Sequence, residues 1–176
     1  LNRLVEAYRK IRNTARFLLG NLCDFDPAGD RVSREDMPEI DRWALHQLQK
    51  LIQKVDRAYE EFSFHSIYHA LYNFCTVDMS ARYLDIIKDR LYVSLPDSRP
   101  RRSAQTVLFD ILSVLSRLMA PILSFTSEEI WASLDKGVKE ESVHLAAFPA
   151  PEPNDINEAL AKTWEDLFTI RGEASR

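Results

Sequence analysis

The fold of this chain is decided first by residues 8–22, which read YRKIRNTARFLLGNL. In and just before this stretch, apolar side chains recur every three or four residues, a spacing that places them on one face of an α-helix. That face consists of Leu4, Tyr8, Ile11, Ala15, Leu18, Leu19 and Leu22. The spacing predicts an amphipathic helix over about residues 1–22, which must bury this face against other elements.

The same spacing returns along the chain, which holds only four glycines in 176 residues. It predicts further helices over about 38–59, 63–92, 102–119 and 126–134, and a last helix from about 155. Pro38 suits a first helical turn, and Pro121 is expected to end the fourth helix. We expect Ser63 to cap the third helix and Thr126 with Glu129 to form a capping box. The sequence therefore predicts an all-α protein, an antiparallel helix bundle.

Two regions are expected. Residues 1–134 form the bundle, and residues 135–176 form an extended, proline-rich segment and the start of a C-terminal helical region. The only plausible strand is 143–145, which we interpret as extended loop because one strand cannot make a sheet. The chain starts without Met, inside a helical pattern, so we expect it to be part of a longer protein.

The first helix carries a basic stripe although the chain has a net charge of −4. Residues 1–20 hold five basic side chains and one acidic one. A local positive surface on an acidic protein favours an anionic partner, and arginine with asparagine can contact both phosphates and base edges. The candidate RNA-facing residues are Arg9, Lys10, Arg12, Asn13 and Arg16. The alternatives are a solvated face, Arg12 pairing with an acid, or Asn13 capping a neighbouring helix.

A second basic cluster comprises Lys88, Arg90, Arg99, Arg101 and Arg102. The first two lie near a predicted helix C-terminus, where cations are favoured in any case. The other three, Arg99, Arg101 and Arg102, fall in or beside a predicted loop. They suit contacts to an RNA backbone, or pairing with acidic residues of a neighbour. A third set, Asp78, Arg82, Asp85 and Asp89, is expected to form ion pairs along its helix.

Enzymatic signatures are scarce. His65 and His69 have the spacing of a helical metal pair, but no Glu-x-x-His motif lies near them, and we predict no metal site. The sequence has no Walker loop, nucleophile elbow or dinucleotide-binding glycines, and we predict no catalytic residues and no cofactor in the chain itself. No apolar run is long enough for a membrane span. Cys23 and Cys75 indicate neither a disulfide framework nor zinc, which favours a reduced cytoplasmic setting.

Four blocks of sequence resemble the anticodon-binding domain of isoleucyl-tRNA synthetases, which are class I enzymes. The blocks are IRNTARFLLGNL with Asp24-Phe25, DRWAL at 41–45, DMSARYLDIIKDRLY at 78–92, and RSAQT at 102–106 running on to APILSFT at 120–126 and EEIW at 128–131. The likeness covers about residues 4–150. The equivalent domain of valine-specific synthetases is the main competitor within the class.

The resemblance implies an antiparallel bundle of the class I anticodon-binding type that binds the anticodon stem-loop of tRNA(Ile). It implies that the full-length enzyme uses ATP with magnesium, and in many members zinc, to attach isoleucine to tRNA. This segment alone is then expected to be a non-catalytic, cytoplasmic and monomeric module. A helical protein-interaction module that docks an acidic partner is the alternative from a different class.

Overall fold

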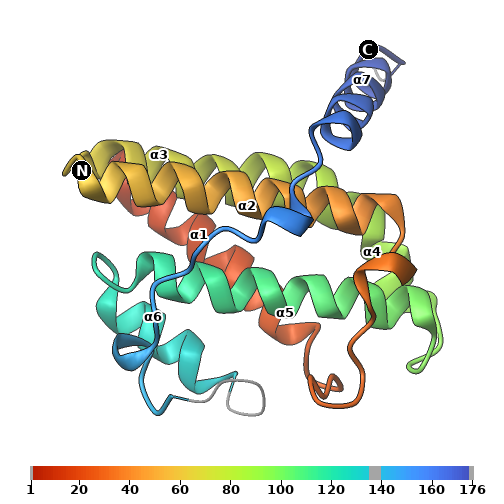
Figure 1. Cartoon of the computed structure of the whole chain (residues 1–176), viewed down its shortest axis with the longest axis horizontal. Helices are drawn as coiled ribbons and strands as arrows, with labels where there is room; N and C mark the ends of the chain where they lie inside the picture. Colours follow the sequence, from red (N-terminus) through yellow and green to blue (C-terminus); the bar gives the residue numbers. More distant parts are fainter. Residues whose placement is uncertain (1, 135–139, 175–176) are drawn as a thin grey trace.

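The computed structural model describes residues 2–134 and 140–174, and within them every regular element is a helix. The long elements are α1 (Asn2–Gly20), α2 (Glu39–Glu60), α3 (Phe64–Asn73), the π-helical segment η2 (Phe74–Tyr83), α4 (Leu84–Val93) and α5 (Arg99–Met119). The shorter or later ones are α6 (Ser124–Ala132), α7 (Glu158–Ala174) and the 3-10 turns η1 (Arg34–Asp36), η3 (Val143–Leu145) and η4 (Pro153–Asp155). In Figure 1, α1, α2, the α3–α4 helix and α5 run in alternating directions. The predicted all-α antiparallel bundle is confirmed.

The buried faces follow the predicted periodicity in the middle of the bundle. On α2, Ile40, Ala44, Leu48, Leu51, Ile52 and Val55 are all buried. On α1, Ile11, Ala15 and Leu18 are buried, but Leu4 and Tyr8 near its start remain 58% and 38% exposed. The apolar stripe of α1 therefore extends about two turns beyond the core it packs against.

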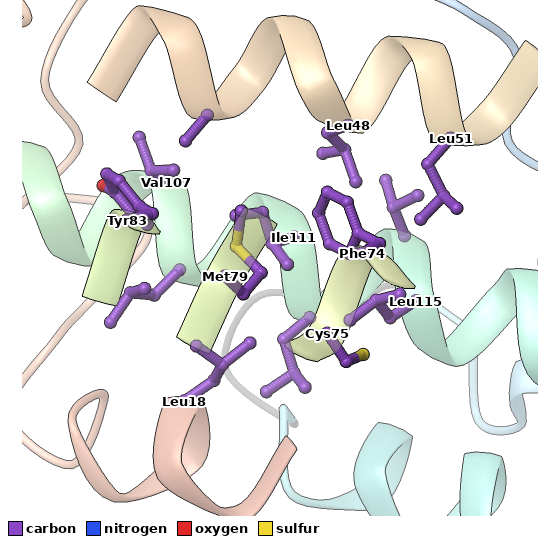
Figure 2. Packing of buried hydrophobic residues seen from close by; sticks show 14 of the residues in the cluster. Leu18, Leu48, Leu51, Phe74, Cys75, Met79, Tyr83, Val107, Ile111 and Leu115 are labelled. Atoms are coloured by element: carbon purple, nitrogen blue, oxygen red, sulfur yellow. The ribbon is translucent and has the colours of Figure 1, made fainter. Parts of the chain in front are cut away.

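The third predicted helix is continuous from Phe64 to Val93, but its centre is widened into the π-helical segment η2. The core residues of this segment include Cys75, Met79 and Tyr83, which are spaced four residues apart. All three are fully buried. Figure 2 shows them with Phe74 between Leu48 and Leu51 of α2 and Leu18 of α1, with the α5 residues Val107, Ile111 and Leu115 among them.

Asp41 lies at the centre of a buried polar network that ties four elements together. Its carboxylate is 0% exposed and accepts hydrogen bonds from Tyr83 Oη (2.9 Å), Ser103 Oγ (2.5 Å) and Arg90 Nη2 (2.7 Å). Burial and the neighbouring Asp41 charge raise the pKa of Tyr83 well above its ordinary value, so its hydroxyl stays a donor. One carboxylate in the first turn of α2 thus fixes η2, α4 and α5.

Several local predictions were wrong. The fourth helix begins at Arg99 instead of Arg102, so the arginine cluster lies in its first turn and not in a loop. Ser63 occupies the N-cap position of α3, but its hydroxyl bonds to Ser66 Oγ and not to a backbone N–H. The predicted capping box does not form because α6 begins two residues earlier. Pro38 lies just before the first turn of α2 and not within it. The 3-10 turn η3 takes the place of the extended loop predicted at 143–145. The last helix, α7, begins at Glu158 and not near residue 155. The helix end before Pro121 is confirmed.

The acidic linker between α1 and α2 is held down by α5. Gln105 Nε2 donates to Asn21 O (2.9 Å) and Asp24 Oδ1 (2.7 Å), and Thr106 Oγ1 accepts from Val32 N (3.1 Å). Phe25 is buried, with its ring centroid 6.0 Å from that of Phe109. These contacts give the linker a fixed path across the bundle.

The last part of the described chain packs back on α2. Trp164 and Phe168 of α7 lie against the core, with the Phe168 ring 5.1 Å from that of Trp43. His46 is buried, and its Nδ1 accepts a hydrogen bond from Asn157 N (2.9 Å) just before α7. Because burial lowers the pKa of His46, the ring is neutral near pH 7 and free to accept this bond. Residues 135–139, on the predicted border between the two regions, lie outside the described residues.

Candidate nucleic-acid interface

The basic residues of α1 are all exposed, on the side opposite the buried Ile11, Ala15 and Leu18. Helical geometry divides them. Arg12 and Arg16, four residues apart, lie on the flank that faces α6, whereas Lys10 and Asn13, three apart, lie on the flank that faces α4. Arg9 lies between the two flanks, paired with Glu6 at 3.1 Å. The predicted basic stripe of α1 therefore contributes residues to two separate grooves.

The first groove runs between α1 and α6, has a volume of about 300 Å³ and is lined by Arg12, Arg16, Thr126 and Glu129 among others. Arg12 Nη2 lies 3.2 Å from Glu129 Oε1, so Arg12 is paired with an acid, which was one of the alternatives for this residue. Tyr8 Oη and Thr126 Oγ1 lie 3.0 Å apart and join the same two helices. Arg16 makes no ion pair or side-chain hydrogen bond with the described residues, so its guanidinium is available to an anion in this groove.

The second groove runs between α1, η2 and α4 and has a volume of about 510 Å³. Lys10 and Asn13 line it from α1, and Lys88 and Tyr92 line it from α4. Within residues 2–134 and 140–174, neither Lys10 nor Asn13 has a side-chain partner, so the alternative of Asn13 as a cap of a neighbouring helix is not seen. Tyr92 was absent from the predicted site. Its spacing of four residues from Lys88 on one helix was the signal that could have found it.

The arginines in the first turn of α5 form ion pairs and hydrogen bonds with the linker between α1 and α2. Arg99 pairs with Asp36, Arg101 Nη2 lies 2.8 Å from Asp24 Oδ2, and Arg102 Nη1 donates to Asp24 O at 2.7 Å. The side chains of Arg101 and Arg102 are only 18% and 12% exposed. Slight burial opposes ionisation of Asp24, but the hydrogen bond from Gln105 and the charge of Arg101 outweigh it and lower the pKa of Asp24. These contacts hold the linker, and the RNA-binding role predicted for this cluster stays a prediction.

The third charged set forms ion pairs, and two of the four reach α7. Arg82 binds Glu165 through both terminal nitrogens at 2.8 Å and lies 3.8 Å from Asp78. Asp85 pairs with Lys88 (3.0 Å) and with Arg171. The predicted pairing within the set is therefore confirmed for Asp78 with Arg82. Asp85 pairs instead with Lys88 and with Arg171 of α7, and Asp89 has no ion-pair partner among the described residues.

Replacing Asp78 with asparagine is expected to stabilise the protein near pH 7. Burial raises the pKa of Asp78 to about 6, although Arg82 opposes the shift, so the folded state disfavours the ionised carboxylate. Since the folded pKa lies above the unfolded value of 3.8, the stability that this group contributes is present below about pH 4 and is lost as the pH rises through about 6. Asp78→Asn should raise the free energy of unfolding by about 1–2 kcal/mol at pH 7.5.

Urea denaturation at two pH values checks this expectation. Near pH 4 the gain should vanish, because the wild-type carboxyl is then largely protonated as well. The exposed Asp56 on α2 gives the matched control, Asp56→Asn, which should change little at either pH. An Asp78→Asn protein that is less stable than wild type at pH 7.5 would contradict the assignment.

The described residues offer little for catalysis or metal binding. Among residues 2–134 and 140–174, no group of three or more His, Cys, Asp or Glu side chains is arranged to hold a metal ion. Cys75 is buried, burial raises the pKa of its thiol to about 12, and Cys23 is exposed. In the same part of the chain, no helix is long and apolar enough to cross a membrane. The arrangement that remains is a basic helix with a groove on each flank, suited to a polyanion.

Comparisons with known proteins bear on this surface. The family model described as the anticodon-binding domain of tRNA ligase matches residues 41–175. The chain is 51% identical over 176 residues to an isoleucine–tRNA ligase of Desulfitobacterium hafniense (strain DSM 10664 / DCB-2). It is 54% identical over 176 residues to one of Geobacter sulfurreducens and 54% identical over 173 residues to one of Carboxydothermus hydrogenoformans. These matches cover 98–100% of this chain but only 19% of the length of each relative.

A solved structure shares the fold. LeuRS of Agrobacterium radiobacter K84, crystallised in a ternary complex with tRNA and LeuAMS, matches 87% of this chain and 16% of its own chain. The TM-score is 0.54 and the sequence identity is 23%, which shows the helical architecture alone. The matches to isoleucine–tRNA ligases include α1, which precedes the residues that the family model covers.

Proposed function

Because this chain belongs to the family of anticodon-binding domains of tRNA ligases, we propose that it binds the anticodon stem-loop of isoleucine tRNA as one part of an isoleucine–tRNA ligase. The parent protein would attach isoleucine to that tRNA with ATP and magnesium. Since the chain spans 19% of its relatives, the chemistry would belong to the remaining part of such a protein. The role of this chain is then to hold the RNA.

The observation that carries the proposal is the exposed basic face of α1. Two grooves flank the helix, and its exposed residues include Arg9, Lys10, Arg12, Asn13 and Arg16. A rigid helix presents these groups at fixed spacings, as a phosphate backbone requires, and guanidinium groups bind phosphate oxygens through paired hydrogen bonds. The isoleucine specificity of the proposal is supported by relatives that are 51–54% identical across almost the whole chain.

The proposal is tested by measuring binding of an isoleucine-tRNA anticodon stem-loop over a range of salt concentrations. Each phosphate that a cation neutralises releases counterions, so the affinity should fall linearly on a logarithmic plot against salt. With three to four cations of α1 engaged, the slope should be about −3 on such a plot. Affinity that does not change with salt would contradict a phosphate-binding surface.

Glu129→Gln is expected to strengthen binding about twofold to fivefold at low salt. Glu129 lies 3.2 Å from Arg12 and places a negative charge in the groove that a phosphate would enter. Its removal frees the guanidinium and relieves repulsion of the RNA, and an exposed ion pair contributes at most about 1 kcal/mol to folding. Glu61→Gln, at the exposed end of α2, is the control and should leave the affinity unchanged. Weaker binding by Glu129→Gln would show that the carboxylate supports the interface.

A further inference from the structure

We propose that the groove between α1 and α4 binds a single unpaired nucleotide, with its base stacked on Tyr92 and its phosphate bound by Lys10. The proposal rests on the proposed RNA-binding function and assigns the second groove a role of its own. It specifies a nucleotide from a loop, because a base that is paired in a stem has no free face for a side chain to stack on.

Tyr92 supplies the surface for the base. It lies near the end of α4, is 64% exposed and makes no side-chain hydrogen bond with the described residues. An aromatic ring left in water with no partner is a stacking surface that accepts any base, since every base has a π face. Phe17 and Leu84 give the groove an apolar wall beneath it, the surroundings that a flat ring prefers over water.

The cations supply the contact to the backbone. Lys10 enters the groove from α1 without an ion-pair partner among residues 2–134 and 140–174, and Lys88 enters from α4. Among the described residues, Asp85 is the one carboxylate lining the groove, and it is matched by Lys88 at 3.0 Å and by Arg171. The hydrogen bonds from Arg171 and Lys88 lower the pKa of Asp85, so both cations stay engaged with it near pH 7. The excess positive charge in the groove is therefore that of Lys10.

Polar groups in the groove allow the base edge to be held as well. The Asn13 amide has a donor and an acceptor, and both are free within the part of the chain that the structure describes. Ser80 lines the same groove, with its hydroxyl hydrogen donated to Cys75 O at 2.7 Å and its lone pairs still available as acceptors. The combination of ammonium groups, an exposed ring and an amide is typical of sites for single-stranded nucleic acid.

The test compares two RNAs and three variants of the 176-residue chain. One RNA is the isoleucine anticodon stem-loop, and the other is a blunt duplex with the same number of phosphates and no unpaired bases. Tyr92→Ala should weaken binding of the stem-loop about tenfold, the usual effect of removing one stacked base. It should leave binding of the duplex and the salt slope of both RNAs unchanged. Tyr92→Phe should retain stem-loop affinity within about twofold, because the ring face remains.

Phe64→Ala is the matched control, because Phe64 is 55% exposed at the start of α3 and lines neither groove. It should bind both RNAs as wild type does. Equal stem-loop affinity of wild type and Tyr92→Ala would overturn the groove assignment while leaving the α1 surface intact. Equal losses on both RNAs would overturn it too, since they would reveal a general effect on the surface. Failure of the wild-type chain to bind either RNA would instead reject the proposed function itself.

Discussion

Asp41→Ala is expected to lower the free energy of unfolding by about 3–5 kcal/mol, the usual cost of removing one partner from a buried charge pair. The substitution leaves the Arg90 guanidinium without its carboxylate. Because the Arg90 side chain is only 20% exposed, water compensates little for this loss. It also removes the acceptor of the buried Tyr83 hydroxyl and of Ser103. Because these residues belong to η2, α4 and α5, the loss affects the packing of most of the bundle.

Urea denaturation followed by circular dichroism measures this effect. Asp41→Asn should lie between wild type and Asp41→Ala, because the amide oxygen still accepts hydrogen bonds but no longer balances the charge of Arg90. Asp56→Ala, an exposed position on the same helix, should change the stability by less than about 0.5 kcal/mol. A loss below about 1 kcal/mol for Asp41→Ala would show that the network is dispensable.

The double variant Arg12→Ala/Arg16→Ala should weaken binding of the isoleucine anticodon stem-loop by about 30-fold or more at low salt. Each lost phosphate contact also reduces the salt slope by about one, so the slope should fall by about two. Both side chains are exposed, and the Arg12–Glu129 pair is 51% and 66% exposed, so the variant should fold as wild type does. The effect is therefore on binding and not on the bundle.

The charge-matched control is Arg42→Ala/Arg57→Ala, which removes two exposed arginines from α2. It changes the net charge of the chain by the same amount but leaves α1 intact. A similar loss of affinity in both double variants would mean that binding depends on overall charge alone. A loss confined to the α1 variant supports a defined RNA surface.

Periodicity predicted the helices and most of the core because burial of an apolar face is a local property of the sequence. The faces of α2 and α5 show this, since nearly all of their predicted apolar positions are buried. The π-helical segment could not be predicted in the same way. Cys75, Met79 and Tyr83 are spaced as on an ordinary α-helix, so their spacing gives no sign that the helix is widened here.

Within the candidate site, the exposure of the α1 residues could be predicted from the sequence, but the partners of the α5 arginines could not. Exposure of the α1 stripe follows from its own apolar face, so all five of its residues were placed correctly on the surface. The partners of Arg101 and Arg102 lie 77 and 78 residues away in the linker, and nothing local indicates that pairing. The Asp41 network is equally non-local, joining residues 42, 49 and 62 positions apart. A charged residue therefore gives little sign in the sequence of whether it faces RNA or another helix.

The central claim is that the α1 face binds a tRNA anticodon stem-loop, and an equilibrium competition tests it most directly. Labelled isoleucine anticodon stem-loop is bound to the 176-residue chain and displaced by three unlabelled RNAs of equal charge: the same stem-loop, one with a different anticodon loop, and a blunt duplex. The isoleucine stem-loop should displace the label at the lowest concentration and the duplex at the highest. Displacement by all three at the same concentration would contradict it, because the surface would then bind any polyanion.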